Sequence, residues 1–271
     1  MTVARALLRT SHPLPSLAIT AMIMALVVQA APHGVGPWAA VPVVLAGELS
    51  IGWSNDVCDA ARDAAAGRTD KPLATGEISR RAVLTAAVLA LAVSVGLAFV
   101  ISVPTGVVNA VMMAAGWSYN FGLKATPWSG LAYATGFGLI PAFAASTVPG
   151  SPLPHWTVIA AATLLGLGGH FANVLPDLAA DEQTGVHGLP QLIAARFGPT
   201  AVRGGALILL LAASALIAAS GAHWELWIGF ALAAGLAAVG LRAAGRTPFL
   251  AAMGIAAIGA ASFVLGGVQL V

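Results

Sequence analysis

Long apolar stretches separated by short polar connections run through the whole sequence. Each stretch is close to the roughly 20 residues that a helix needs to cross the hydrocarbon core of a bilayer. Connections such as Ser102-Val103-Pro104 contain helix breakers. The pattern predicts an all-α, polytopic membrane protein with nine transmembrane helices, at about residues 14–31, 36–54, 82–101, 104–122, 129–147, 155–175, 199–220, 224–241 and 248–270.

The composition supports an integral membrane protein. Hydrophobic residues make up 59% of the 271 residues and charged residues only 8%, and the mean hydropathy is +0.90. Soluble domains carry roughly 25% charged residues, so this chain cannot cover a soluble surface. The single cysteine, Cys58, excludes a disulfide within the chain. We expect one domain over residues 1–271, in the lipid bilayer of a bacterial or archaeal cell.

The basic residues indicate how the helices are oriented. Eleven of the 12 Lys and Arg residues lie at the N-terminus or in the connections that follow predicted helices two, four, six and eight, and Arg203 lies at the same side, near the start of the seventh predicted helix. The positive-inside rule makes that side cytoplasmic. We therefore expect the N-terminus and the two long loops inside and the C-terminus outside. Because these residues sit in short loops rather than on one face or tail, the isoelectric point near 9.1 does not indicate a nucleic-acid partner.

The two long cytoplasmic loops, 55–81 and about 176–198, both begin with carboxylates at the end of a predicted helix. In the first, Asn55, Asp59 and Asp63 recur every four residues, so they share a face if the helix continues. Asp56 lies beside that face. The second loop repeats the spacing with three residues, Asn173, Asp177 and Asp181.

An amide and two carboxylates on each of two helices form an all-oxygen ligand set if the helices face one another across a cavity. Such a set suits Mg²⁺, which protein sites usually hold with a few carboxylates and substrate phosphates. Zinc is excluded as the expected metal because paired Cys and His ligands are absent from the sequence. The expected substrate is a phosphate or diphosphate, with Arg68, Lys71 and Lys124 to balance its remaining charge. One charge run is more often a solvated loop, but two matched runs favour a site.

Four segments also carry a family resemblance, and they occur in order along nearly the whole chain: NDVCDAARD at 55–63, GRTDKPLATGEIS at 67–79, YNFGLK at 119–124 and DLAADEQTGVHGLPQLIAARFG at 177–198. They resemble the NDxxDxxxD motif, the segment after it, the Tyr…Lys segment and the second DxxxD motif of the UbiA superfamily of intramembrane prenyltransferases. The chain departs from the family pattern at His12-Pro13, where Arg-Pro is frequent, at Lys71, where Arg is usual, and at His187, where Lys is frequent.

The resemblance implies nine helices around a central cavity with two cytoplasmic cap loops. It also implies two Mg²⁺ ions that hold a prenyl diphosphate. The residues it assigns to the metal are Asn55, Asp56, Asp59, Asp63, Asp177 and Asp181. Those it assigns to binding of the diphosphate are Arg68, Lys71, Lys124, Asn55 and Asn173. Those it assigns to catalysis are Tyr119, Asp59, Asp177 and Asp181.

The implied function is transfer of an isoprenoid group from a prenyl diphosphate to a small acceptor of the aromatic or quinone type. The reaction passes through Mg²⁺-dependent ionisation to an allyl cation. A terpene cyclase of the same superfamily, which needs no acceptor, is the alternative. A secondary transporter would carry its ion-binding carboxylates mid-membrane, whereas here nearly all charges lie at the cytoplasmic helix ends.

Several further polar and aromatic residues have two possible roles. Glu48, Asn109, Asn120 and His170 either face the expected cavity or form hydrogen bonds within the helix packing. Four aromatic residues near the motifs either stabilise a cation through their ring faces or serve in packing, namely Trp53, Trp117, Tyr119 and Phe121.

Overall fold

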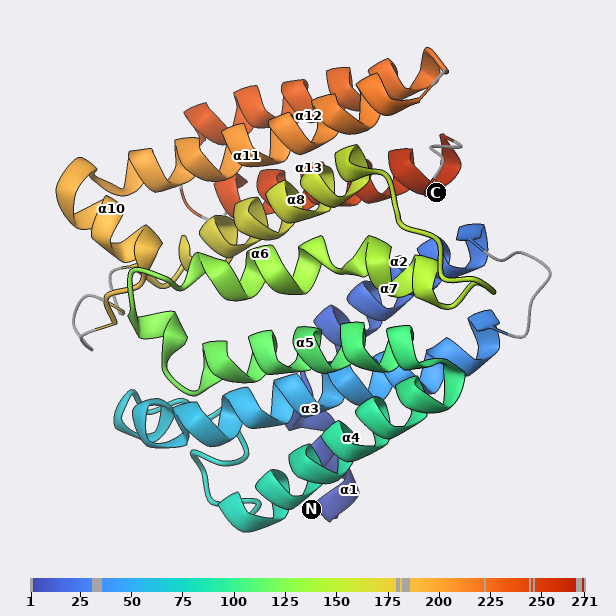
Figure 1. Cartoon of the computed structure of the whole chain (residues 1–271). Helices are drawn as coiled ribbons and strands as arrows, with labels where there is room; N and C mark the ends of the chain where they lie inside the picture. Colours follow the sequence, from blue (N-terminus) through green and yellow to red (C-terminus); the bar gives the residue numbers. More distant parts are fainter. Residues whose placement is uncertain are drawn as a thin grey trace. The chain divides into compact units, whose positions relative to one another are not determined.

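The structure is a computed structural model of the chain. It describes residues 2–30, 36–178, 181, 186–221, 223–243, 245, 247–266 and 270. Every regular element in these residues is a helix, so the all-α prediction is confirmed for them (Figure 1). The elements are α1 Val3–Thr10, α2 Pro13–Ala30, α3 Gly36–Ala65, α4 Arg80–Ile101, α5 Val103–Asn120, η1 Leu123–Ala125, α6 Gly130–Gly138, α7 Ile140–Ser146, α8 Trp156–Val174, α10 Leu189–Phe197, α11 Pro199–Ser220, α12 Glu225–Arg242 and α13 Thr247–Leu265.

Each predicted apolar stretch contains a helix, but four features differ from the prediction. The fifth stretch is divided into α6 and α7, where Pro141 lacks the N–H that would continue the helical hydrogen bonds. α3 continues to Ala65, well beyond the predicted end at residue 54. The short helix α1 lies before residue 14, where no helix was predicted, and α10 lies within the predicted loop 176–198. By length and composition, five of the described helices can cross a membrane, namely α4, α8, α11, α12 and α13.

The chain forms two compact units. The first contains Met1–Phe121 and Ser146–Ser151, and the second contains Gly122–Ala145 and Pro152–Val271. In the first unit α3 packs against α1, α2, α4 and α5. Buried hydroxyl groups join these helices, since Ser50 Oγ donates to Ala87 O on α4 and Ser94 Oγ donates to Val43 O on α3, both at 2.9 Å. α3 is therefore the central helix of this unit.

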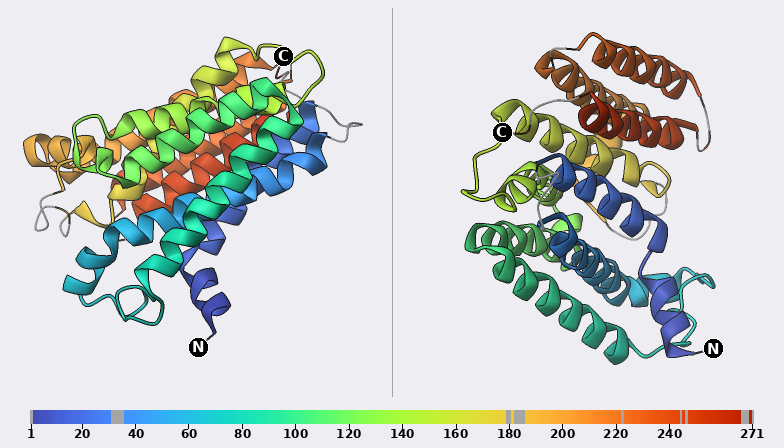
Figure 2. Two further views of the ribbon diagram at one scale, coloured as in Figure 1. Left: turned by 60° about the horizontal axis from the view of Figure 1, so that its bottom comes forward. Right: turned by 90° about the vertical axis from the view of Figure 1, so that its right-hand side faces the viewer.

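In the second unit α8 and α11 pack against one another, and α6, α10, α12 and α13 pack around them. Figure 2 shows this group of helices from two further directions. The buried core is built mainly from α8, α11, α12 and α13 and includes Phe171, Leu207, Leu210 and Ile255. Gly168 lets α8 approach α11 closely, because a Cβ at this position would lie 2.6 Å from Leu210 Cγ and 3.2 Å from Ala206 O. Small residues at such crossings are typical of helix packing in membranes.

We predict that Gly168→Ala destabilises the protein, because the added methyl group must displace Leu210 or the backbone of α11. Overpacking of this kind costs about 1–3 kcal/mol. The neighbouring variant Gly169→Ala is the matched control, since a Cβ at Gly169 meets nothing within 4 Å. Thermal unfolding in detergent is expected to show a lower midpoint for Gly168→Ala and an unchanged or higher midpoint for Gly169→Ala. Equal midpoints would contradict the close packing of α8 on α11.

Candidate active site

The end of α3 carries the first predicted motif, and the helix positions all of its polar side chains. Because α3 stays helical to Ala65, Asn55, Asp59 and Asp63 lie on one face, as the four-residue spacing predicted. Asn120, at the end of α5, donates from Nδ2 to Ile51 O at 3.0 Å and to Ser54 Oγ at 2.8 Å. These bonds fix the turn of α3 that precedes the motif.

Asp56 is the most deeply buried carboxylate of the motif, with 1% of its surface exposed. Its Oδ1 accepts a hydrogen bond from Lys71 Nζ at 2.7 Å and lies 2.8 Å from His12 Nε2. Asp56 lies two residues beyond the predicted membrane segment. Burial alone raises the pKa of its carboxyl group, but the contacts with His12 and Lys71 outweigh this and hold the pKa below its ordinary value.

Asp59 and Asp63 lie along the adjoining face. Asp59 is 9% exposed, and its Oδ1 lies 3.3 Å from Arg62 Nη2. Burial raises the pKa of the Asp63 carboxyl group; Lys71 opposes this rise and the charge of Asp59 adds to it. The charges of the three aspartates and of the loop cation thus act on one another at this end of α3.

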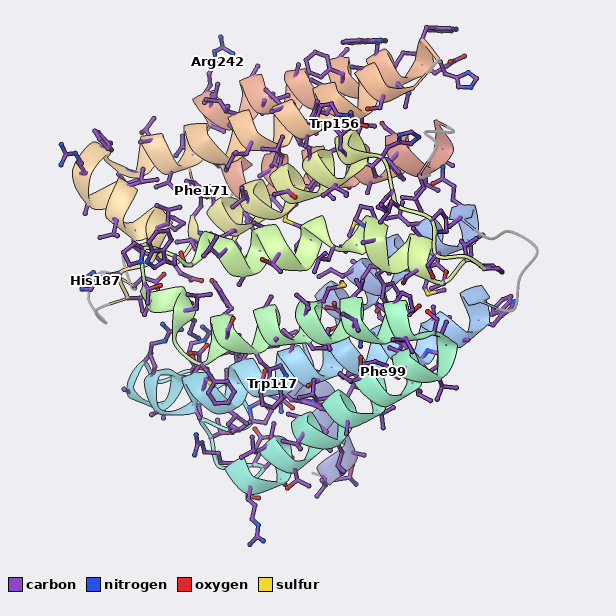
Figure 3. The ribbon with its side chains drawn as sticks, viewed as in Figure 1. Phe99, Trp117, Trp156, Phe171, His187 and Arg242 are labelled. Atoms are coloured by element: carbon purple, nitrogen blue, oxygen red, sulfur yellow. The ribbon has the colours of Figure 1, made fainter. Side chains whose placement is uncertain are left out.

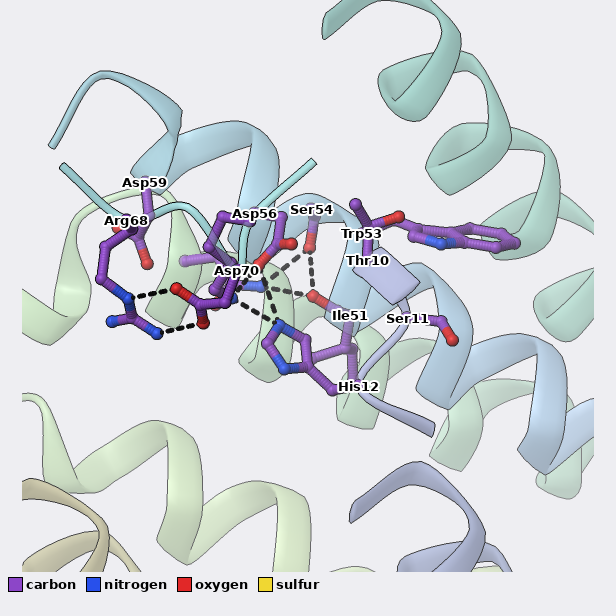
Figure 4. A network of polar contacts seen from close by, with 12 residues as sticks. Thr10, Ser11, His12, Ile51, Trp53, Ser54, Asp56, Asp59, Arg68 and Asp70 are labelled. Carbon is purple, nitrogen blue, oxygen red and sulfur yellow. Dashed lines mark hydrogen bonds and ion pairs between the residues drawn. The ribbon is translucent and has the colours of Figure 1, made fainter. Parts of the chain in front are cut away.

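The loop after α3 supplies the cations. Arg68 donates from Nε and Nη2 to the two carboxylate oxygens of Asp70, both at 2.8 Å, and these bonds lower the pKa of Asp70. Arg9 of α1 donates to Glu77 Oε2 at 2.9 Å and to Asp70 O at 3.1 Å. Figure 4 shows the Arg68–Asp70 pair and the contact between His12 and Asp56. The predicted diphosphate contact Arg68 is therefore paired with Asp70, and Lys71 with Asp56.

The second motif lies in the other unit and does not form one continuous helix. Asn173 is exposed in the last turn of α8, which ends at Val174. Pro176 follows and cannot donate the next helical hydrogen bond. Asp177 is exposed beyond it, and Asp181 N donates to Asp177 O at 2.8 Å. The predicted repeat of the first arrangement is therefore interrupted by Pro176.

The start of α10 ties the second motif to the Tyr…Lys segment. Gln191 Nε2 donates to Asp181 Oδ2 at 2.8 Å. Position 188 leaves no room for a side chain, because a Cβ there would lie 2.5 Å from Lys124 O and 2.6 Å from Gln191 Oε1. Asp181, Gln191 and the backbone of Lys124 are thus linked through one tightly packed turn.

Hydrogen bonds occupy most of the polar residues whose role the sequence leaves open. Asn109 Nδ2 donates to Ser94 Oγ at 3.0 Å, and His170 Nε2 lies 2.9 Å from Ser129 Oγ, which also accepts from Leu189 N. These contacts, with those of Asn120, favour the packing role for all three residues. Glu48 is half-buried within α3.

Two of the four aromatic residues beside the motifs, Trp117 and Trp53, form hydrogen bonds within the helix packing. Trp117, labelled in Figure 3, donates from Nε1 to Ser50 Oγ at 3.0 Å, and Trp53 Nε1 donates to Leu7 O at 2.9 Å. Phe121 is 62% exposed. Tyr119 is half-buried at the end of α5, and His187 is exposed.

Ser129 and Gln191 contact these groups and were not predicted as site residues, whereas Arg9 and His12 were considered only because the family often has Arg-Pro where this chain has His12-Pro13. The only sequence signal for His12 was the departure His12-Pro13 itself. Proline at the first position of a helix is favourable, and α2 begins at Pro13. Ser129 carries no recognisable spacing, because its partner Leu189 is 60 residues away; Gln191 lies within the segment 177–198, 10 residues after its partner Asp181.

The described residues contain no group of three His, Cys, Asp or Glu side chains that could hold a metal ion without a substrate. The oxygen donors at the end of α3 nevertheless suit Mg²⁺, which is usually held by one or two carboxylates together with substrate phosphates. Asp56 Oδ2 is buried and has no hydrogen-bond partner among the described residues, but Oδ1 is already taken by Lys71 and His12, so Asp56 is not counted among these donors. The donor set therefore fits a magnesium ion that binds with a phosphate group.

Known proteins give the family context. No curated protein sequence matches the chain. In structure, the chain is similar to a digeranylgeranylglyceryl phosphate synthase, with 15% identity, a TM-score of 0.73, and coverage of 98% of this chain and 99% of that one. It is also similar to an apo UbiA homologue from Aeropyrum pernix K1, with 19% identity, a TM-score of 0.71 and 98% of each chain covered.

A third structure, a UbiA homologue from Archaeoglobus fulgidus bound to GPP and Mg²⁺, shares 18% identity and a TM-score of 0.67, with 97% of this chain and 99% of that one covered. At these identities the structures show a shared fold. The model of the UbiA prenyltransferase family matches residues 16–249, which include all four motif segments. The chain therefore belongs to the UbiA prenyltransferase family.

Proposed function

We propose that this protein transfers an isoprenoid group from a prenyl diphosphate to a small acceptor of the aromatic or quinone type. The observation that carries the proposal is the charge arrangement at the end of α3. Asn55, Asp59 and Asp63 share one face, and Lys71 and Arg68 act on the charge of Asp63. Oxygen ligands beside cations are what a metal-bound diphosphate requires.

Magnesium is the proposed cofactor. The residues that would hold it are Asn55, Asp59 and Asp63 in the first motif and Asp177 and Asp181 in the second, with Asn173 in support. The fit rests on the all-oxygen donor set. A UbiA homologue with the same fold is bound to GPP and Mg²⁺, and another structure of that homologue is bound to DMAPP and Mg²⁺. When bound, Mg²⁺ would act as a Lewis acid on the leaving diphosphate.

The protein's own cations complete the proposed diphosphate site. Arg68, Lys71 and Lys124 would donate hydrogen bonds to diphosphate oxygens, and such charge-assisted bonds are stronger than neutral ones. The allylic C–O bond then breaks, and its electron pair leaves with the diphosphate, where these cations stabilise the charge. Tyr119 would contact the reacting end of the prenyl group.

The allyl cation that remains must meet the acceptor before water. A nucleophilic carbon or oxygen of the acceptor forms the new bond to the prenyl carbon, and the acceptor then loses a proton. The apolar helices of the chain suit this step, since they provide surroundings with little water. A cyclase would quench the same cation within the prenyl chain.

Product analysis tests the transferase proposal. The purified protein, in lipid, is given a panel of prenyl diphosphates with Mg²⁺, with and without phenolic and quinone-type acceptors. We expect mass spectrometry to detect a prenylated acceptor only when an acceptor is present. A cyclic hydrocarbon or alcohol formed without any acceptor would overturn the transferase proposal in favour of the cyclase.

We also predict the effect of removing one carboxylate from each motif. Asp59→Asn and Asp177→Asn are expected to lower kcat by about 100-fold or more, because losing a metal ligand exceeds the 10- to 100-fold cost of disturbing the groups that support ligands. The matched control is Glu225→Gln, an exposed acidic residue at the start of α12. Its activity and the thermal unfolding of all three variants are expected to match wild type. Near-normal turnover by either Asp variant would remove that residue from the site.

A further inference from the structure

A partly buried three-residue contact joins the N-terminal segment to the first motif. Lys71 Nζ and His12 Nε2 lie 2.7 and 2.8 Å from the same oxygen, Asp56 Oδ1, and 3.2 Å from each other. The side chain of Asp56 is 2% exposed, that of Lys71 14% and that of His12 37%. A carboxylate this buried must be paired with a cation and hydrogen-bonded to stay charged. Asp56 is therefore built to hold the Lys71 ammonium in one place.

The backbone around His12 is fixed by its own hydrogen bonds. His12 adopts a φ of 50°, in the left-handed region that residues other than glycine rarely occupy. Thr10 and Ser11 before it are buried; Thr10 Oγ1 donates to Leu7 O at 2.9 Å and Ser11 Oγ donates to Leu8 O at 2.8 Å. Ser16 Oγ in α2 donates back to Ser11 O at 2.9 Å. An unusual backbone conformation persists only where its surroundings determine it, and here it carries the imidazole that contacts Asp56.

Helix α1 is also attached to α3. Trp53 of α3 donates to Leu7 O, and Ala6 and Val57 are buried together with Ile78 and Val83. The right-hand view of Figure 2 shows α1 at the N-terminus beside the loop that follows α3.

A second contact of α1 reaches that loop directly. Arg9 binds Glu77 and the backbone oxygen of Asp70, the residue before Lys71. The N-terminal segment thus contacts the loop on both sides of Lys71, at Asp70 and at Glu77.

We infer that His12 and Asp56 are positioning residues for Lys71, and that the α1–α2 junction serves to fix this lysine for the diphosphate. Asp56 acts through Lys71 rather than as one of the ligands that hold the metal. His12 supplies a second nitrogen at Asp56 Oδ1, so the carboxylate cannot turn away from the position in which it holds Lys71. This inference rests on the proposed function for its kinetic consequence, but its structural part can be tested without any substrate.

The kinetic test is a double-mutant cycle. We expect His12→Ala and Asp56→Asn each to raise KM for the prenyl diphosphate about 10-fold, the loss of roughly one charge-assisted bond, while kcat changes far less. His12→Gln, which keeps a nitrogen donor, is expected to recover most of the affinity. In a Lys71→Met background each of the two changes should raise KM further by less than about twofold, because both act through the lysine that is missing.

The same cycle can overturn the inference. If Asp56→Asn raises KM as much in the Lys71→Met protein as in wild type, this result would show that Asp56 acts independently of Lys71, as a metal ligand does. A large fall in kcat with an unchanged KM would do the same. Thermal unfolding separates these outcomes from loss of folding, and His155→Ala, at an exposed histidine before α8, is the matched control.

The substrate-free test uses the fact that Lys71 and Lys124 are the only two lysines in the sequence. A water-soluble amine reagent is applied to the folded protein, and peptide mass spectrometry gives the labelling of Lys71 relative to Lys124. We expect this ratio to rise severalfold in His12→Ala and Asp56→Asn and to stay at the wild-type value in His155→Ala. An unchanged ratio in the first two variants would overturn the positioning role. A raised ratio in a protein that shows no prenyl transfer would instead reject the proposed function and leave the contact in place.

Discussion

The charges at the end of α3 impose the constraint on which this part of the structure depends. Three aspartates, Asp56, Asp59 and Asp63, lie within eight consecutive residues of a chain that is only 8% charged. Carboxylates that approach one another away from water cannot all stay ionised unless cations balance them. The loop after α3 brings Lys71 to Asp56, and the short helix α1 binds this loop through Arg9. The remaining charge suits a metal ion and a diphosphate.

The second unit holds one carboxylate of its motif through a turn. Asp181 accepts a hydrogen bond from the Gln191 amide at Oδ2. The turn that carries Gln191 is locked by Gly188 against Lys124 O and by the bond from Leu189 N to Ser129 Oγ. This turn thus places Asp181 beside Gln191 and the backbone of Lys124, whereas Asp56 holds the Lys71 side chain.

The sequence predicted the parts of the fold that depend on local pattern. Apolar length located the long helices, and the four-residue spacing placed Asn55, Asp59 and Asp63 on one face because α3 stays helical. It missed α1, because these eight residues contain two arginines and are too short to count as an apolar stretch. It also missed the partners of Asp56 and Asp181. His12 is 44 residues from Asp56, and no spacing rule connects residues that only tertiary packing brings together.

The account's central claim is that the carboxylates of this protein bind a diphosphate through a metal. The most direct measurement is calorimetric binding of an unreactive prenyl thio-diphosphate analogue to the protein in detergent, with Mg²⁺ and with EDTA. Binding that is tight with Mg²⁺ and lost in EDTA is the predicted result, because the carboxylates repel a bare diphosphate. Equal affinity under both conditions would contradict the account.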